Sequence, residues 1–228
     1  MDPACTCENC ELKELFVENL EGDSMLEMCN SKFEREYAAG EIIIKEGTQI
    51  HDFIYLKSGL VKLFRSDPSG LEQIITIAKP MDYVSLLSVF SNREYNYSVA
   101  ALDDSVTCSL KLSTLLAMMD KNSRLALGLL RKMSLAADRI ILDSLEIRKK
   151  HLRGRVAHLL LYFSEQVYFS PEFELPLTRK EMAEYVGMTT ENVIRSLSEF
   201  RKDEILKIYG KTIHIINTET LRSIADFG

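Results

Sequence analysis

The chain has 228 residues, 46% apolar and 27% charged, a composition typical of globular proteins with a packed core. Its length suits one large domain or two small ones. No stretch contains the roughly 18 uncharged apolar residues that span a membrane. The N-terminus lacks the basic-then-apolar order of a signal peptide. We therefore expect a cytoplasmic protein that is not bound to a membrane.

Charge is distributed unevenly along the chain. The formal net charge is −6, from 28 basic and 34 acidic residues. Residues 148–228 hold 13 basic and 11 acidic residues, a net +2, so the 15 basic and 23 acidic residues of 1–147 give −8. The C-terminal third is therefore the part whose charge favours a nucleic-acid partner.

Residues 1–30 are predicted to form an N-terminal arm with one or two short helices. This arm is rich in cysteine: Cys5, Cys7, Cys10 and Cys29 lie in it, and Cys108 is the fifth cysteine of the chain. An odd number of cysteines in a chain that is not exported favours free thiols or metal ligands over disulfides.

Residues 31–120 show short β-type runs separated by turn residues. Many short strands at spacings of about 8–12 residues predict a sandwich or barrel. The runs are 42–44, 53–56, 60–64, 73–78, 97–101 and 106–110.

Residues 121–152 are predicted to form one long helix, because the segment has no proline and a single glycine, Gly128. Apolar residues at alternating steps of four and three indicate a coiled-coil seam, and hence a homodimer. The alternative is a helix that packs on its own barrel. In a dimer Asp143 would face its copy and weaken association, unless the seam is rotated onto Ser144. The predicted interface is Leu129, Met133, Ala136, Ile140, Asp143 and Ile147.

Residues 153–228 contain the pattern of a helix-turn-helix. Thr178 and Glu181 have the spacing of a capping box, Gly187 ends that helix, and Thr189 or Thr190 caps the next. Glu191 and Arg195 share one side of the second helix, where Arg can bind guanine and Glu can accept from cytosine. The alternative for this pair is an ordinary surface salt bridge. The residues expected to contact DNA are Thr178, Arg179, Thr189, Thr190, Glu191, Asn192, Ile194, Arg195, Ser198 and Lys211.

A hairpin is predicted directly after the second helix. Residues 205–208 and 212–216 are β-type runs around the turn Tyr209-Gly210-Lys211, which is typical of the wing in a winged helix. Lys211 at its tip is placed to reach a phosphate. We expect the chain to end in this short β structure.

The stretch 177–197, with Gly210-Lys-Thr-Ile after it, resembles the DNA-binding signature of CRP/FNR regulators, and Gly40, Gly47 and Gly59 sit as in that family's β-roll. The resemblance covers nearly the whole chain. It implies an α+β protein with an N-terminal antiparallel β-roll like cyclic-nucleotide-binding domains, a long dimerisation helix and a C-terminal winged helix-turn-helix. The implied function is a homodimeric transcription factor that binds a palindrome, with RNA polymerase as a partner.

Departures from the family pattern bear on the effector. Cyclic-AMP-binding members have Gly-Glu where this chain has Ser85-Leu86, and an Arg where it has Tyr97-Ser98. A cyclic phosphate without a guanidinium partner is poorly held, and the helix positions that would meet adenine are the apolar Ile140 and Ile141. Cyclic AMP is therefore disfavoured as the effector.

The FNR branch of the family holds a [4Fe–4S] cluster on three N-terminal cysteines and one cysteine of the roll. By this resemblance Cys5, Cys7, Cys10 and Cys108 are the candidate ligands, and thiolates suit iron–sulfur or zinc. The Cys-x-Cys-x2-Cys spacing is tighter than in that branch, and its third ligand position is apolar here, near Phe16. Zinc, thiol redox chemistry, haem or no cofactor remain open, with redox state, oxygen or nitric oxide as the signal.

The recognition helix also predicts a DNA sequence. Glu191 and Arg195 match the FNR-like pattern, whereas Ile194 replaces a Ser and suits a thymine methyl group. We expect palindromic half-sites with a TGA-type core, centred about one helical turn apart. The alternative function is a metal-binding or cyclic-nucleotide-binding β-roll. An enzyme is not expected, because a metal oxygenase needs several histidines inside the roll and only His51 lies there.

Overall fold

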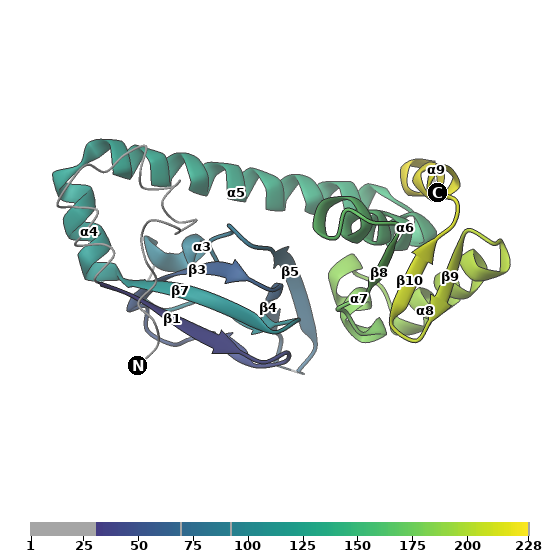
Figure 1. The fold of residues 1–228 in the computed structure, drawn as a ribbon, viewed down its shortest axis with the longest axis horizontal. Helices are drawn as coiled ribbons and strands as arrows, with labels where there is room; N and C mark the ends of the chain where they lie inside the picture. The colour runs from purple at the N-terminus through teal and green to yellow at the C-terminus, as the bar shows by residue number, and fades with distance from the viewer. Residues whose placement is uncertain (1–30, 69, 92, 228) are drawn as a thin grey trace. The chain divides into compact units, whose positions relative to one another are not determined.

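A computed structural model describes residues 31–68, 70–91 and 93–227 of the protein (Figure 1). It divides into two compact units, one made of the described part of residues 1–65 with 76–139, the other of 66–75 with 140–228. The division falls inside a long helix, whereas the predicted domain boundaries were placed at its ends. None of the described helices is long and apolar enough to cross a membrane.

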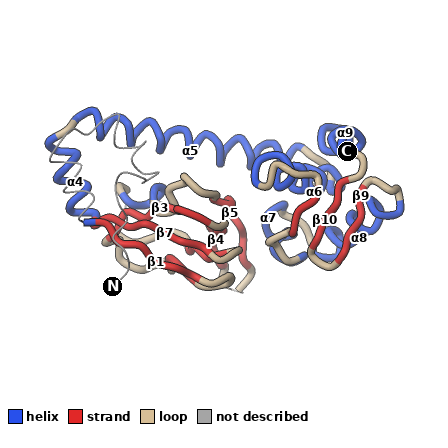
Figure 2. Tube along the Cα trace, in the orientation of Figure 1, coloured by secondary structure: helices blue, strands red, loops and turns tan. Residues whose placement is uncertain are grey.

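The first unit is built on two antiparallel sheets, apart from their residues within 66–75, which group with the second unit. One has the strand order β1–β7–β3 and the other β2–β6–β4–β5 (Figure 2). The paired strands bury one another's apolar side chains, among them Leu56, Val61 and Val99, each fully enclosed. The strands are β1 (Lys32–Tyr37), β2 (Ile42–Ile44), β3 (Asp52–Ser58), β4 (Val61–Ser66), β5 (Glu72–Ala78), β6 (Ser98–Ala101) and β7 (Ser105–Lys111).

The observed strands coincide with the six predicted runs, and β1 precedes them. Turn glycines separate the strands as the sequence indicates. Gly59 shows the reason most clearly: its φ is +87°, and a Cβ there would lie 2.3 Å from the Ser105 Oγ. Only glycine fits a left-handed turn at such close approach.

The helices of the first unit are α3 (Leu86–Val89), α4 (Leu112–Lys121) and the first part of α5 (Ser123–Lys149). The α5 residues up to Arg139 pack on the stretch that ends in α3. The Arg139 guanidinium donates to both Asp82 carboxylate oxygens at 3.1 Å, and the Lys132 ammonium lies 5.7 Å from the centre of the Tyr83 ring. A bidentate charged pair of this kind fixes orientation as well as distance.

The second unit is a winged helix-turn-helix. Its helices share a core of Val156, Leu159, Phe163, Phe200 and Leu221, all at most 1% exposed. Its elements are α6 (Leu152–Tyr162), a π-helical turn η2 (Phe163–Val167), β8 (Glu172–Glu174), α7 (Arg179–Val186), α8 (Thr190–Lys202), β9 (Leu206–Tyr209), β10 (Thr212–Ile215) and α9 (Thr218–Phe227). The predicted α+β fold is confirmed.

The prediction that the chain ends in short β structure was wrong. After β10 the chain forms α9, and the Asn217 side chain accepts a hydrogen bond from the Thr220 N–H at its start. Leu221 and Ala225 lie four residues apart and are buried, which is the spacing of one helix face. Strand β8 was also not predicted; it pairs with β10 and widens the wing to three strands.

The predicted dimer seam lies along the less exposed side of α5. Leu129 is 2% exposed and Ile147 is 7% exposed within a single chain, and Met133, Ala136, Ile140 and Asp143 are half-buried. The two ends of this stripe are therefore covered within the single chain, and its middle is partly accessible.

Asp143 in particular has a neighbour in its own chain. Burial is the main cause that lowers the pKa of His158 on α6, and Lys150 adds to it, while the Asp143 carboxylate acts in the opposite direction. Asp143 therefore lies close enough to His158 to act on it electrostatically, and its role in a dimer stays a prediction.

Candidate nucleic-acid interface

Helix α7 begins at the predicted capping box. The Thr178 hydroxyl oxygen accepts the Glu181 N–H at 3.2 Å, and the Glu181 carboxylate accepts the Thr178 N–H at 2.9 Å. Two of the backbone N–H groups left open at a helix start are thereby satisfied. Thr178, predicted to contact DNA, has its hydroxyl engaged in this cap.

The cap yields a stability prediction. Thr178→Ala removes the acceptor for the Glu181 N–H, so we expect the free energy of unfolding to fall by about 1 kcal/mol. Urea denaturation followed by circular dichroism measures it. Thr178→Ser keeps the hydroxyl and is the matched control. An Ala variant as stable as the Ser variant would contradict the role of the cap.

The turn between α7 and α8 is held by a glycine and an arginine. Gly187 ends α7 with φ +67° in the left-handed region, which a residue without a Cβ adopts freely. The Arg155 guanidinium, from α6, donates to the carbonyls of Val186 at 3.1 Å and Gly187 at 3.2 Å. Arg155 also donates to the Lys150 carbonyl at 3.0 Å, so it joins this turn to the chain that follows α5.

Helix α8 starts at Thr189, whose hydroxyl oxygen accepts the Asn192 N–H at 3.3 Å. Of the two predicted caps, the structure uses Thr189. Val193, Leu197 and Phe200 are buried and hold one side of the helix against the domain, as predicted. The opposite side is left exposed.

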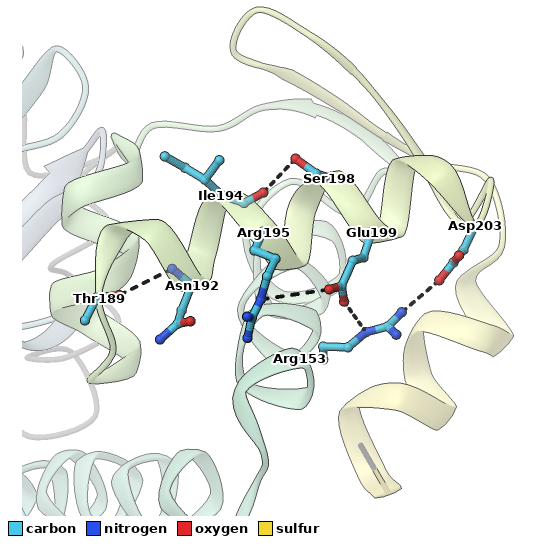
Figure 3. A network of polar contacts seen from close by, with 8 residues as sticks. All are labelled: Arg153, Thr189, Asn192, Ile194, Arg195, Ser198, Glu199 and Asp203. Carbon is cyan, nitrogen blue, oxygen red and sulfur yellow. Dashed lines mark hydrogen bonds and ion pairs between the residues drawn. The ribbon is translucent and has the colours of Figure 1, made fainter.

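The exposed side of α8 carries Glu191, Ile194, Arg195 and Ser198, and Figure 3 shows the last three. Ile194 is 50% exposed, and the Arg195 side chain is 67% exposed. Hydrogen bonds from its own backbone N–H and from Thr189 lower the pKa of the Glu191 carboxyl, which is therefore ionised at neutral pH. The Ser198 hydroxyl donates to the Ile194 carbonyl at 2.8 Å.

The ion pair that Arg195 forms on α8 is not the surface salt bridge with Glu191 that was considered as the alternative. Arg195 pairs with Glu199, and its Nε lies 3.9 Å from the Glu199 Oε1. The Arg153 guanidinium, from α6, approaches Glu199 at 3.4 Å and Asp203 at 2.9 Å (Figure 3). It also lies 5.2 Å from the Phe200 ring centre. Arg195 and Glu191 are therefore left to face outward separately.

The wing presents a second group of exposed residues. Strands β9 and β10 pair through Tyr209 and Thr212, and Gly210 has φ +62° at the tip. Tyr209 is 65% exposed, and Lys211 is exposed beside it. An exposed cation at a hairpin tip can contact a phosphate.

The remaining predicted DNA-binding residues lie closer to the domain. Arg179 is half-buried, its guanidinium donates to the Met182 sulfur at 3.5 Å, and burial lowers its pKa. Thr190 and Asn192 are half-buried in the first turn of α8. The structure thus brings Glu191, Ile194, Arg195 and Ser198 onto one face and turns Arg179 partly inward.

Both units match known protein families. Residues 34–122 match the cyclic nucleotide-binding domain family, and residues 154–224 match the Crp-like helix-turn-helix domain family. The fumarate and nitrate reduction regulatory proteins of Yersinia pestis and Escherichia coli K12 are 27% and 26% identical, each over 97% of this chain and 91% of their own. The chain belongs to the CRP/FNR family of transcription regulators.

Solved structures of the family share this fold. FixK2 from Bradyrhizobium japonicum has a TM-score of 0.75 at 23% identity, over 85% of this chain and 96% of its own. A CRP/FNR-family regulator from Eubacterium rectale has a TM-score of 0.78 at 17% identity, over 92% and 97%. The match to the Crp-like helix-turn-helix family and to curated regulators confirms the prediction that this CRP/FNR protein is a transcription regulator and not an enzyme.

In this CRP/FNR protein, the positions that depart from the cyclic-AMP pattern are tied into the roll. The buried Ser85 hydroxyl oxygen accepts the Ile54 N–H at 2.8 Å. The Tyr97 hydroxyl donates to the Val84 carbonyl at 2.9 Å, and the Ser98 hydroxyl oxygen accepts the Glu46 N–H at 3.0 Å. The hydroxyl groups of these side chains are therefore hydrogen-bonded to the backbone of the roll itself.

The predicted cysteine ligands are only partly described. Cys108 is 3% exposed in β7, between Glu34 of β1 and Tyr55 of β3. Cys5, Cys7 and Cys10 lie outside the described residues. Within the described part of the chain, no three His, Cys, Asp or Glu side chains group as metal ligands.

Two arginines that organise this site, Arg153 and Arg155, were not predicted. Both lie in α6, and the partners that they reach in the helix-turn-helix are about 30 to 50 positions further along the chain. The only signal for them is the rise in positive charge that begins near residue 148.

Proposed function

We propose that this regulator binds double-stranded DNA in a sequence-specific manner through the exposed face of α8. The observation that supports this proposal most directly is that Ile194, Arg195 and the ionised Glu191 project together from a helix whose other side is buried. A carboxylate, an apolar group and a guanidinium are the side chains that distinguish cytosine, thymine and guanine in the major groove. The proposed target is a palindrome with TGA-type half-sites, centred about one helical turn apart.

The test is binding to two duplexes of equal length and composition, one with the palindrome and one scrambled. We expect clearly tighter binding to the palindrome by fluorescence anisotropy at moderate salt, because phosphate contacts alone do not distinguish the two. Equal affinities would contradict the proposal.

We further propose a homodimer formed along a second apolar face of α5, distinct from the predicted seam. Four side chains on that face are 47–65% exposed: Leu127, Leu130, Ile141 and Leu145. They lie within one side of the helix, since steps of three, four and eleven residues return to nearly the same direction. A second copy of the same helix offers a matching apolar stripe.

For the signal, we propose redox state, oxygen or nitric oxide, with cyclic AMP disfavoured. Ser85 and Tyr97 stand where cyclic-AMP-binding members have a glycine and an arginine, and their hydroxyl groups are bonded inside the roll. A [4Fe–4S] cluster on Cys108 and the three N-terminal cysteines is the cofactor within this proposal. Iron and sulfide analysis of anaerobically purified protein, with its visible spectrum, tests it; protein free of iron and sulfide would contradict it.

The relatives support two further parts of the proposal. Proteins named as fumarate and nitrate reduction regulators match almost the whole chain. We propose RNA polymerase as the partner on DNA and the cytoplasm as the location. Co-migration of the polymerase with the DNA-bound protein tests the partner.

A further inference from the structure

Glu199 on α8 is shared between two arginines with different surroundings. Its Oε1 lies 3.9 Å from Arg195 Nε, and its Oε2 lies 3.4 Å from Arg153 Nε. Arg195 belongs to the exposed face of α8, whereas Arg153 comes from α6, and Figure 3 shows the Glu199 carboxylate between the two guanidinium groups. The Glu199 carboxylate therefore lies within ion-pair distance of Arg195, the candidate base-contacting residue, and of Arg153 on α6.

Arg153 is the better anchored of the two. Its Nη2 donates to the Asp203 carboxylate at 2.9 Å, and its guanidinium lies over the Phe200 ring, a ring that is fully buried. Arg153 therefore stays beside Glu199, and its charge offsets that of the carboxylate. Arg195 has the longer contact, and an Arg four residues before a Glu is the weaker orientation of such a pair.

Resting on the proposed function, we infer that Arg153 is a positioning residue for DNA recognition: it occupies Glu199 and so leaves the Arg195 guanidinium available to a base. Without Arg153, the Glu199 carboxylate has Arg195 as its near cation, and binding to guanine must first break that ion pair. Arg153 thus acts on sequence preference through Glu199, without a contact to DNA.

The experiment measures the ratio of affinities for the palindromic and the scrambled duplex. Arg153→Met retains an apolar side chain against Phe200 and removes the charge. We expect the ratio to fall about two- to five-fold, the range of an exposed ion pair. Loss of one positive charge weakens both duplexes alike and cancels in the ratio.

Two further variants separate this role from simple anchoring of α8. Arg153→Met combined with Glu199→Gln is expected to restore the wild-type ratio, because the competing carboxylate is gone. Asp203→Asn removes the charge of the other ion pair but keeps a side-chain oxygen that can accept from Arg153 Nη2, so Arg153 stays beside Glu199 and the ratio is expected to stay unchanged. Thermal unfolding by circular dichroism verifies that each variant is folded.

The outcomes that overturn the inference are distinct. A ratio unchanged in Arg153→Met, or lowered equally by Asp203→Asn, shows that Arg153 does not act through Glu199. A lower ratio in Glu199→Gln alone shows that Glu199 assists Arg195, the reverse of the inference. A wild-type protein that binds both duplexes equally overturns the proposed function itself.

Discussion

Leu130→Asp is expected to convert the protein to a monomer and to lower its affinity for the palindromic duplex by about 100-fold or more. Leu130 is 57% exposed on the apolar face of α5. In a symmetric dimer the substitution places a carboxylate from each chain at the apolar seam. A dimer that has bound one half-site holds its second recognition helix close to the other half-site, which raises the overall affinity by a factor of about 100 to 10,000. A monomer lacks this gain.

Sedimentation equilibrium and fluorescence anisotropy, with and without oxygen, measure the two effects. Ile141→Asp is expected to behave like Leu130→Asp, because Ile141 lies on the same face. Glu146→Gln is the matched control: Glu146 is exposed on α5 away from that face and pairs with Lys149 at 2.9 Å. A dimer that persists in both Asp variants would contradict the proposed interface.

Arg195→Ala is expected to cost roughly 1–3 kcal/mol of binding to the palindromic duplex, about 5- to 150-fold in affinity. Arg195 is the most exposed cation in the middle of α8's outward face, and a guanidinium can donate to both guanine O6 and N7. The variant is also expected to stop discriminating at one G·C pair of each half-site. Competition with duplexes substituted at single positions measures both.

Lys202→Ala is the matched control for Arg195→Ala. Lys202 is an exposed cation in the last turn of α8, away from the N-terminal part that enters the groove. Its loss is expected to weaken specific and scrambled duplexes to the same degree. If Arg195→Ala shows that same uniform loss, Arg195 contacts phosphate and not a base.

The helix-turn-helix could be predicted from the sequence because its boundaries are set locally. The capping box at Thr178 and the left-handed Gly187 depend on residues within one turn. Helix α9 has similar signals, Asn217 as a cap with Leu221 and Ala225 behind it. These signals directly follow the apolar run 212–216, which is typical of a strand. The sequence pattern therefore predicted a β ending and no helix.

The exposure of each face of α5 could not be predicted in the same way. Its sequence has two apolar stripes at helical spacing, one through Leu129 and Ile147 and one through Leu130 and Ile141. Periodicity detects both, but only the folded chain shows which one its own domain covers. The arginine contacts of α6 are equally non-local, since Arg153 and Arg155 meet partners set by tertiary packing.

The most direct test of the central claim, that paired α8 helices bind a palindrome, is selection of duplexes from a random pool by the wild-type protein. We expect the enriched sequences to share two inverted TGA-type half-sites about one helical turn apart. Enrichment of a single asymmetric half-site, or of no common sequence, would contradict the account.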